Sequence, residues 1–143
     1  MSREKVAATA VATVGAVLFA SWTLKMYAVP DPWRPYAIAV REYMAAGVRG
    51  DSNALIRRSA KAQPVAWVLD AAHRQPRMVA AWAHDLSTNA GQRRGDTVLV
   101  ALWADNVEGC SHVNSVTALL LNHSAAPRIL AVSSPCIGPP PPP

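Results

Sequence analysis

An uncharged run near the N-terminus places the strongest constraint on this chain. Residues 6–24 contain no Asp, Glu, Lys or Arg, and the run lies between Lys5 and Lys25. A helix of this length, at about 1.5 Å rise per residue, spans about 29 Å, which matches the hydrocarbon core of a bilayer. The run therefore predicts a single transmembrane helix, with residues 1–28 as a membrane anchor.

The alternative interpretation of the run is a cleaved signal peptide. Cleavage after Ala20 or Ala28 would leave Leu18 or Met26 at the minus-three position, where a small residue is preferred. Aromatic and cationic side chains also follow the run, as they do at membrane interfaces. We therefore expect an uncleaved anchor. Its predicted interfacial residues are Trp22, Lys25, Tyr27 and Trp33, of which Trp33 has the alternative of packing under the following domain.

The charges beside the run hardly favour one orientation of the anchor, because Arg3 and Lys5 precede the run while Lys25 and Arg34 follow it. The short N-terminal segment and the long C-terminal part fit a signal anchor with its C-terminus outside. We expect an inner or plasma membrane protein that crosses the membrane once, with its C-terminal domain periplasmic or extracellular.

The two cysteines favour the same compartment. Cys110 and Cys136 flank a predicted hairpin whose turn lies at residues 123–127, so folding the chain there brings them opposite each other. This register predicts a disulfide, which requires an oxidising compartment. The alternative is two free thiols.

Charge argues against a nucleic-acid partner. The chain of 143 residues has a formal net charge of +5, and its cations are spread along the sequence. No stretch has the clustered basic and aromatic residues of a nucleic-acid platform. A mildly basic domain is suited to an anionic membrane surface, so the membrane itself is one expected partner.

The part after the anchor is predicted to be α+β. A proline-rich spacer at residues 29–35 precedes one domain at residues 36–136. The predicted helices cover residues 36–49, 53–61 and 65–74, and Arg57, Arg58 and Lys61 form the basic side of the second helix. The predicted strands cover residues 78–88, 97–104, 112–122 and 128–133, with turn material at residues 89–96. The alanines within residues 78–88 leave a helix possible there.

Short motifs along this domain resemble a known superfamily. They are Gly50-Asp51, Ala54-Leu55, Gly95-Asp96, TVLV at residues 97–100 and RILAV at residues 128–132. The pattern is similar to the nuclear transport factor 2-like (cystatin-like, SnoaL-like) superfamily. The resemblance implies helices packed in a curved antiparallel sheet, forming a cone with a pocket. Some bacterial members with an N-terminal membrane helix are accessory parts of envelope complexes.

The resemblance does not imply catalysis here. Enzymes of the superfamily usually place an Asp–His pair or a tyrosine in the cone, whereas His84 and Asp85 are neighbours on a predicted strand and would point to opposite faces. We expect no enzyme activity, no catalytic residues, no cofactor and no metal site. The residues of a possible pocket are Trp67, His84 and Trp103.

Residues 137–143 form a predicted polyproline tail, in which five prolines after Gly138 favour a polyproline II conformation suited to a partner's groove. The predicted partner-binding residues are Pro139, Pro140, Pro141, Pro142 and Pro143; the alternative is a solvated tail that binds nothing. We therefore predict a non-catalytic accessory subunit of a membrane complex, either energy-transducing (photosynthetic or respiratory) or for envelope transport. Its partners would be other membrane-protein subunits.

The alternative function is a membrane-tethered cone domain that binds a small ligand or acts as an enzyme. It predicts an open pocket with convergent polar groups, such as His84 with Tyr43 or Asp70, and a cone filled by Trp67, Trp82 and leucine side chains would contradict it. The sequence predicts no particular small-molecule ligand.

Overall fold

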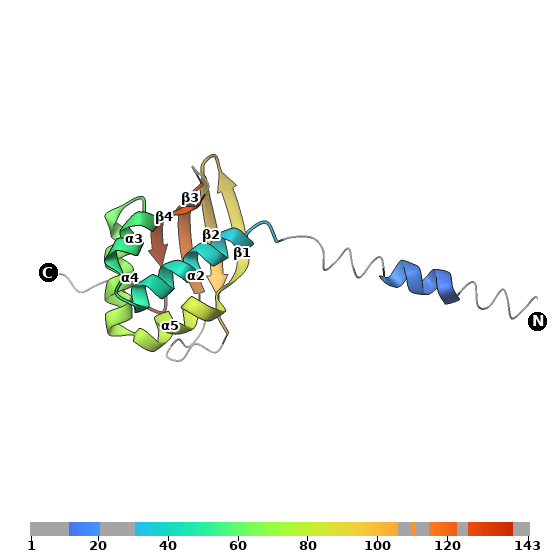
Figure 1. Cartoon of the computed structure of the whole chain (residues 1–143), viewed down its shortest axis with the longest axis horizontal. Coiled ribbons are helices and arrows are strands. Elements are labelled where there is room, and N and C mark those ends of the chain that lie inside the picture. The colour runs from blue at the N-terminus through green and yellow to red at the C-terminus, as the bar shows by residue number, and fades with distance from the viewer. Residues whose placement is uncertain (1–11, 21–30, 106–109, 111–114, 123–125, 139–143) are drawn as a thin grey trace, which may run out of the picture. The chain divides into compact units, whose positions relative to one another are not determined.

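The computed structural model describes residues 12–20, 31–105, 110, 115–122 and 126–138. The chain divides into two compact units, Met1–Pro32 and Trp33–Pro143. In the first unit, residues 12–20 form an exposed helix, coloured blue in Figure 1. No helix among the described residues is long and apolar enough to cross a membrane. The remainder of the predicted anchor lies outside the described residues, and the anchor therefore stays a prediction.

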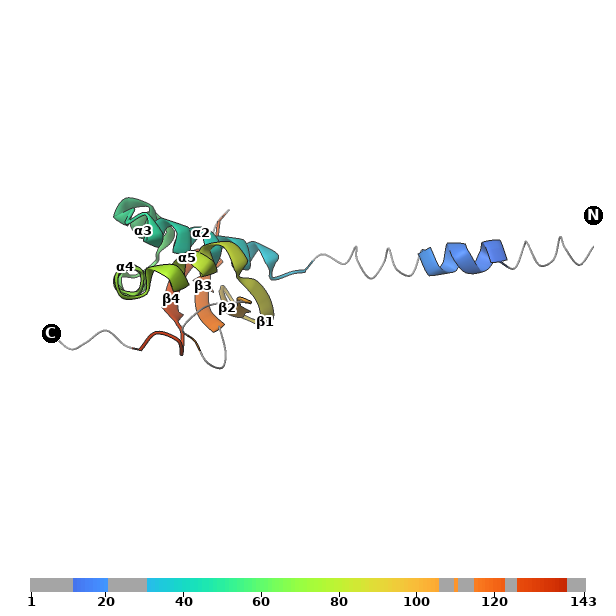
Figure 2. The same cartoon turned by 90° about the horizontal axis from the view of Figure 1, so that it is seen from below.

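The second unit is α+β, which confirms the predicted class. The helices are α2 (Arg34–Val48), α3 (Ser52–Arg58), α4 (Ala62–Arg74) and α5 (Pro76–Asp85). The strands are β1 (Ser87–Arg94), β2 (Thr97–Trp103), β3 (Ser115–Leu121) and β4 (Arg128–Ser133). The helices lie together on one face of the sheet (Figures 1 and 2).

The sheet is an antiparallel meander with the order β1-β2-β3-β4. Burial alternates along β2: Val98, Val100 and Leu102 are fully buried toward the helices, whereas Leu99 and Trp103 are largely exposed. Because successive side chains of a strand point to opposite faces, the exposed residues lie on the face away from the helices. This period-2 pattern is the reason that β2 could be located from sequence.

The segment predicted as a strand at residues 78–88 is mostly helix α5. Pro76 is in the first turn of the helix, where a backbone N–H has no intrahelical partner, so the missing N–H of proline costs no hydrogen bond. Met78, Val79 and Trp82 are buried at a helical spacing, and the alanines between them favour a helix. The strand prediction is therefore wrong from residue 78 to residue 85, where the structure has the alternative helix that the alanines left possible.

Strand β1 occupies residues 89–94, which were predicted as turn material, together with Ser87 and Thr88. Its sequence, STNAGQRR, has no apolar alternation, and most of its residues are exposed. Pairing with β2 makes it a strand: Gln92 lies opposite Leu99 and Arg94 opposite Thr97. The hairpin turn between them contains Gly95 with φ +58°, a conformation that glycine adopts readily.

The core lies between the helices and the inner face of the sheet. Trp82 is fully buried, and its ring stacks on Trp67 with centroids 6.4 Å apart and an interplanar angle of 16°. Tyr43 and Met44 of α2 are also fully buried. Large side chains thus fill the space between the helical layer and the sheet.

Candidate functional site

The predicted disulfide is confirmed: Cys110 and Cys136 are bonded, with Cα atoms 5.2 Å apart. A tight turn follows β4, in which the Ser134 hydroxyl donates to the Ser115 carbonyl oxygen at 2.7 Å and accepts from the Cys136 N–H at 3.1 Å. Ile137 is 4% exposed and belongs to the core. The last described part of the chain is therefore fastened to the domain by a covalent bond, hydrogen bonds and a buried side chain.

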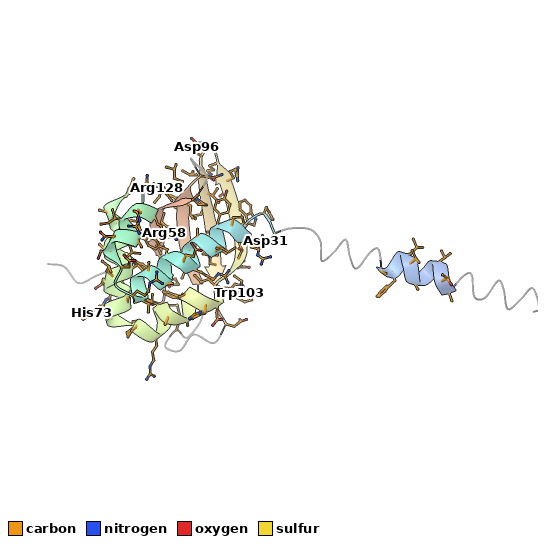
Figure 3. All side chains as sticks on the ribbon, viewed as in Figure 1. Asp31, Arg58, His73, Asp96, Trp103 and Arg128 are labelled. Atoms are coloured by element: carbon orange, nitrogen blue, oxygen red, sulfur yellow. A yellow bond between two sulfur atoms is a disulfide. The ribbon has the colours of Figure 1, made fainter. Side chains whose placement is uncertain are left out.

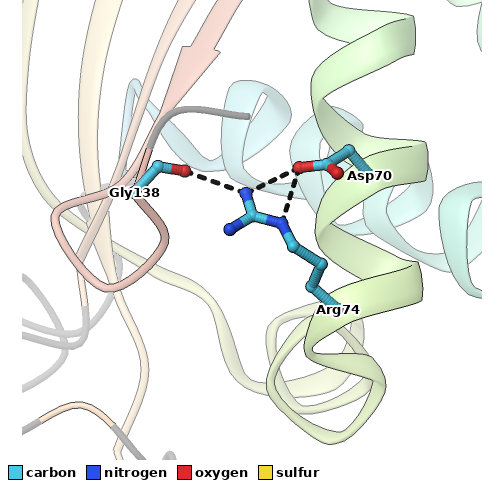
Figure 4. Close-up of polar contacts among 3 residues, drawn as sticks. All are labelled: Asp70, Arg74 and Gly138. Atoms are coloured by element: carbon cyan, nitrogen blue, oxygen red, sulfur yellow. Dashed lines mark hydrogen bonds and ion pairs between the residues drawn. The ribbon is translucent and has the colours of Figure 1, made fainter. Parts of the chain in front are cut away.

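Arg74 on α4 is hydrogen-bonded to Gly138, the residue after Ile137 (Figure 4). The Arg74 guanidinium donates to the Asp70 carboxylate at 2.9 Å and 2.6 Å, and to the Gly138 carbonyl oxygen at 2.9 Å. Asp70 and Arg74 are four residues apart on one helix face, so the carboxylate orients the guanidinium. The five predicted tail residues, Pro139 to Pro143, lie outside the described residues.

The three residues predicted to line a pocket do not come together. Trp67 is 8% exposed and packs in the core on the helical side of the sheet. Trp103, labelled in Figure 3, is 49% exposed and ends β2 on the face away from the helices. His84 is exposed in the last turn of α5, and Asp85 follows it on the same helix, so the opposite-face argument made for a strand does not apply.

The two residues that could have joined His84 in a pocket have other partners. The hydroxyl groups of Tyr43 and Ser59 are hydrogen-bonded at 2.6 Å inside the core. Burial raises the pKa of the Tyr43 phenol, and the smaller, opposite effect of the Ser59 hydrogen bond lowers it. Asp70 is paired with Arg74.

Trp33, predicted at the membrane interface, takes the alternative position under the domain. Its ring is half-buried against the core and lies 6.2 Å from the Tyr36 ring, centroid to centroid. It also covers the backbone of Gly91 in β1, where an added Cβ would overlap three atoms of the indole. The other predicted interfacial residues, Trp22, Lys25 and Tyr27, lie outside the described residues.

A hollow of about 330 Å³ lies where the turn between α3 and α4 meets β4. We call it the α3–α4 hollow, and its lining residues are Ile56, Ser59, Ala60, Lys61, Ala62, Val65 and Arg128. The Ala60 N–H donates to the Ile129 carbonyl oxygen at 2.7 Å, so the turn follows the edge of β4. Figure 3 labels Arg58 and Arg128 at this end of the domain.

The sequence predicted only one of the two basic parts of this hollow. It identified a basic side on residues 53–61, but it had no means of adding Arg128, which is far away in the sequence. The docking of the α3–α4 turn on β4 places Arg128 and Lys61 on the lining of the same hollow. The only sequence signal for Arg128 is its place as a basic residue at the start of a predicted strand.

A second hollow, of about 350 Å³, lies on the face of the sheet that the helices leave uncovered. It is lined by Gln92, Arg94, Thr97, Leu99 and Leu119. In the described part of the chain, no three His, Cys, Asp or Glu residues are grouped so that they could hold a metal ion.

Comparisons with protein-family models, with curated proteins and with solved structures find no match to this chain. The resemblance to the nuclear transport factor 2-like superfamily therefore stays a prediction.

Proposed function

We propose that this chain is a non-catalytic accessory subunit of a larger membrane complex. In this proposal the N-terminal helix anchors the chain, the α+β domain lies on the periplasmic or extracellular side as a cone-like, nuclear transport factor 2-like module, and the proline tail binds a neighbouring subunit. The function of the host complex, in energy transduction or in envelope transport, is left open.

The observation that carries the proposal is the fastening of the chain just before the prolines. The disulfide, the buried Ile137 and the bond from Arg74 to Gly138 fix the point where the tail leaves the domain. A binding segment with a fixed origin loses less conformational freedom when it is captured than one on a free end. The five prolines that follow are themselves restricted in φ, which lowers the cost further.

Two further features support the accessory role. The disulfide suits an oxidising compartment, in keeping with a domain outside the cytoplasm. Trp67 and Trp82 stack in the core, and Tyr43 and Asp70 are bonded to Ser59 and Arg74, which favours the accessory role over the ligand-binding or enzymatic alternative.

Purification of the complex tests the proposal. The full chain, tagged at its N-terminus so that the tail is native, is extracted from its own cells in a mild detergent and analysed by quantitative mass spectrometry. We expect a fixed stoichiometry with a defined set of membrane proteins. Recovery of the chain alone would contradict the proposal.

A matched variant tests the tail. Residues 139–143 are replaced by five alternating glycine and serine residues, which keep the length of the tail but remove the polyproline preference. We expect this variant to lose at least one subunit while its domain keeps the same unfolding midpoint. Full retention of every subunit would show that the tail takes no part.

A labelling assay tests the compartment separately. Whole cells are treated with a membrane-impermeant maleimide, with and without a reductant. We expect labelling of the denatured chain only after reduction, because both cysteines are in the disulfide. Labelling without reduction would contradict the disulfide, and no labelling with either treatment would contradict a location outside the cytoplasm.

A further inference from the structure

We propose that the α3–α4 hollow binds a phosphate-type anion carried on a short apolar chain, that is, the head of an anionic amphiphile. The inference goes beyond the accessory role, since it uses neither the anchor nor the tail. It rests on the rigidity of the floor of the hollow, on the charges at its rim and on its apolar wall.

The floor of the hollow is formed by Ser59 and Ala60, and hydrogen bonds to α2, α3 and β4 hold it in place. Ser59 is buried, its hydroxyl donates to the Leu55 carbonyl oxygen at 2.7 Å, and it is bonded to the Tyr43 hydroxyl. The Ser59 carbonyl oxygen accepts from the Arg128 guanidinium, and the Ala60 N–H is bonded to β4. The turn between α3 and α4 is therefore ordered before any ligand arrives, which lowers the cost of binding.

Of the described residues that line the hollow, two have basic side chains, Lys61 and Arg128. The Lys61 ammonium has no hydrogen-bond or ion-pair partner among the described residues, and Arg128 uses one of its five N–H donors on the Ser59 carbonyl. Among the described residues, no carboxylate lines the hollow. The carboxylates near α3 are engaged elsewhere: Glu42 pairs with Arg58, and Asp51 caps α3 by accepting from the Ala54 N–H at 3.0 Å.

A group with several acceptor oxygens and a negative charge satisfies these donors best. A cation in the same place would meet two like charges. An uncharged polar ligand would leave both charges without a counterion. The rim therefore favours a phosphate-type anion.

The wall of the hollow is apolar. Ile56 is 58% exposed although it is a large hydrophobic residue, and half-buried Val65 is on the same lining. A ligand with an apolar part would cover Ile56 and remove its apolar surface from water, which favours binding. The volume of about 330 Å³ is at the small end of the range for ligand sites, so it suits a head group and the first carbons of a chain.

The test uses the full chain, labelled with ¹⁵N, in micelles of a non-ionic detergent. Amide signals of Ala60 and Ala62 are followed by NMR during titration with butyl phosphate, inorganic phosphate or butanol. We expect saturable shifts with butyl phosphate, weaker binding of inorganic phosphate and no saturable binding of butanol. Titration of empty micelles corrects for partition of the ligand.

Matched variants assign the contributions. Lys61→Gln removes a cation from the rim, and we expect it to weaken butyl phosphate binding about tenfold, as for the loss of one charge-assisted hydrogen bond. Arg57→Gln removes the same charge from the last turn of the neighbouring helix α3, outside the lining, and it should change the affinity less than about twofold. Ile56→Ser should weaken butyl phosphate but leave inorganic phosphate unchanged.

Three results would overturn the proposal. The first is the absence of saturable shifts with butyl phosphate in the folded chain. The second is an equal loss of affinity in Lys61→Gln and Arg57→Gln, which would indicate general charge attraction only. The third is equal affinity for inorganic and butyl phosphate, which would identify a free anion rather than an amphiphile as the ligand.

Discussion

At the scale of single residues, the contact between Gly91 and Trp33 joins the start of the domain to an edge strand. A Cβ at position 91 would overlap ring atoms of the indole, and these belong to a rigid fused ring that moves only as a whole. We expect Gly91→Ala to destabilise the domain by about 1–3 kcal/mol, as for overpacking of a core. The free energy of unfolding in urea measures this effect.

A double-mutant cycle separates ring overlap from a backbone effect. In the Trp33→Ala background the overlap is absent, so Gly91→Ala should then cost less than about 0.5 kcal/mol. The same cost in both backgrounds would mean that the indole is not the cause.

A buried phenol provides a second prediction at this scale. Burial raises the pKa of the Tyr43 phenol above its ordinary value near 10. Above about pH 10 the unfolded chain releases this proton while the folded chain keeps it, so stability is complete below pH 10 and falls as the pH rises toward the folded pKa. We expect Tyr43→Phe to make this fall shallower.

At neutral pH the same substitution should cost about 1 kcal/mol, because it removes the hydrogen bond between the Tyr43 and Ser59 hydroxyls. Urea unfolding at several pH values from 8 to 11 measures both effects. An unchanged alkaline slope in Tyr43→Phe would mean that other groups cause the fall.

At the scale of elements, the disulfide closes the β3–β4 hairpin over a sequence separation of 26. In the chain-entropy model, removing it destabilises the domain by about 3 kcal/mol. We expect the Cys110→Ser, Cys136→Ser double variant to unfold at a correspondingly lower urea concentration. Wild type unfolded in a reductant is the matched control, and the two should agree; a double variant as stable as the oxidised wild type would contradict the prediction.

The elements that the sequence predicts well are those with a regular apolar pattern. Buried residues of strand β2 alternate with half-buried or exposed ones, and the predicted range 97–104 matches Thr97–Trp103 closely. The pairing of Cys110 with Cys136 followed from the same hairpin symmetry. Local pattern and nearby pairing determine these features, so a single sequence contains enough information to find them.

Helix α5 and strand β1 could not be assigned in this way. The alanines beside Trp82 are compatible with a helix or a strand, and only packing on α2 and α4 decides between them. Strand β1 has polar residues throughout and depends on pairing with β2. The α3–α4 hollow was missed for a related reason, because its second cation, Arg128, comes from β4, an element that is distant in the sequence.

At the scale of the whole molecule, Trp33–Pro143 forms a compact unit by itself. We expect a fragment of residues 31–143, oxidised, to unfold cooperatively with a free energy within about 1 kcal/mol of that of the full chain, because a domain with its own core folds alone. Circular dichroism during urea unfolding of both proteins makes the comparison. A fragment with no cooperative transition would show that the N-terminal unit is needed for folding.

The disulfide also determines how the domain would respond to mechanical force. Tension applied between the two ends of the chain passes directly between Cys136 and Cys110 through the disulfide, because this bond is shorter than the backbone that joins the two cysteines. The β3–β4 hairpin lies inside the closed loop and is therefore excluded from that path. The closed loop would be about 90 Å long if extended, at about 3.4 Å per residue, and it bears no tension until the disulfide is reduced. If the C-terminal prolines hold a neighbour while the N-terminus is fixed, half of the sheet is shielded from the strain between them.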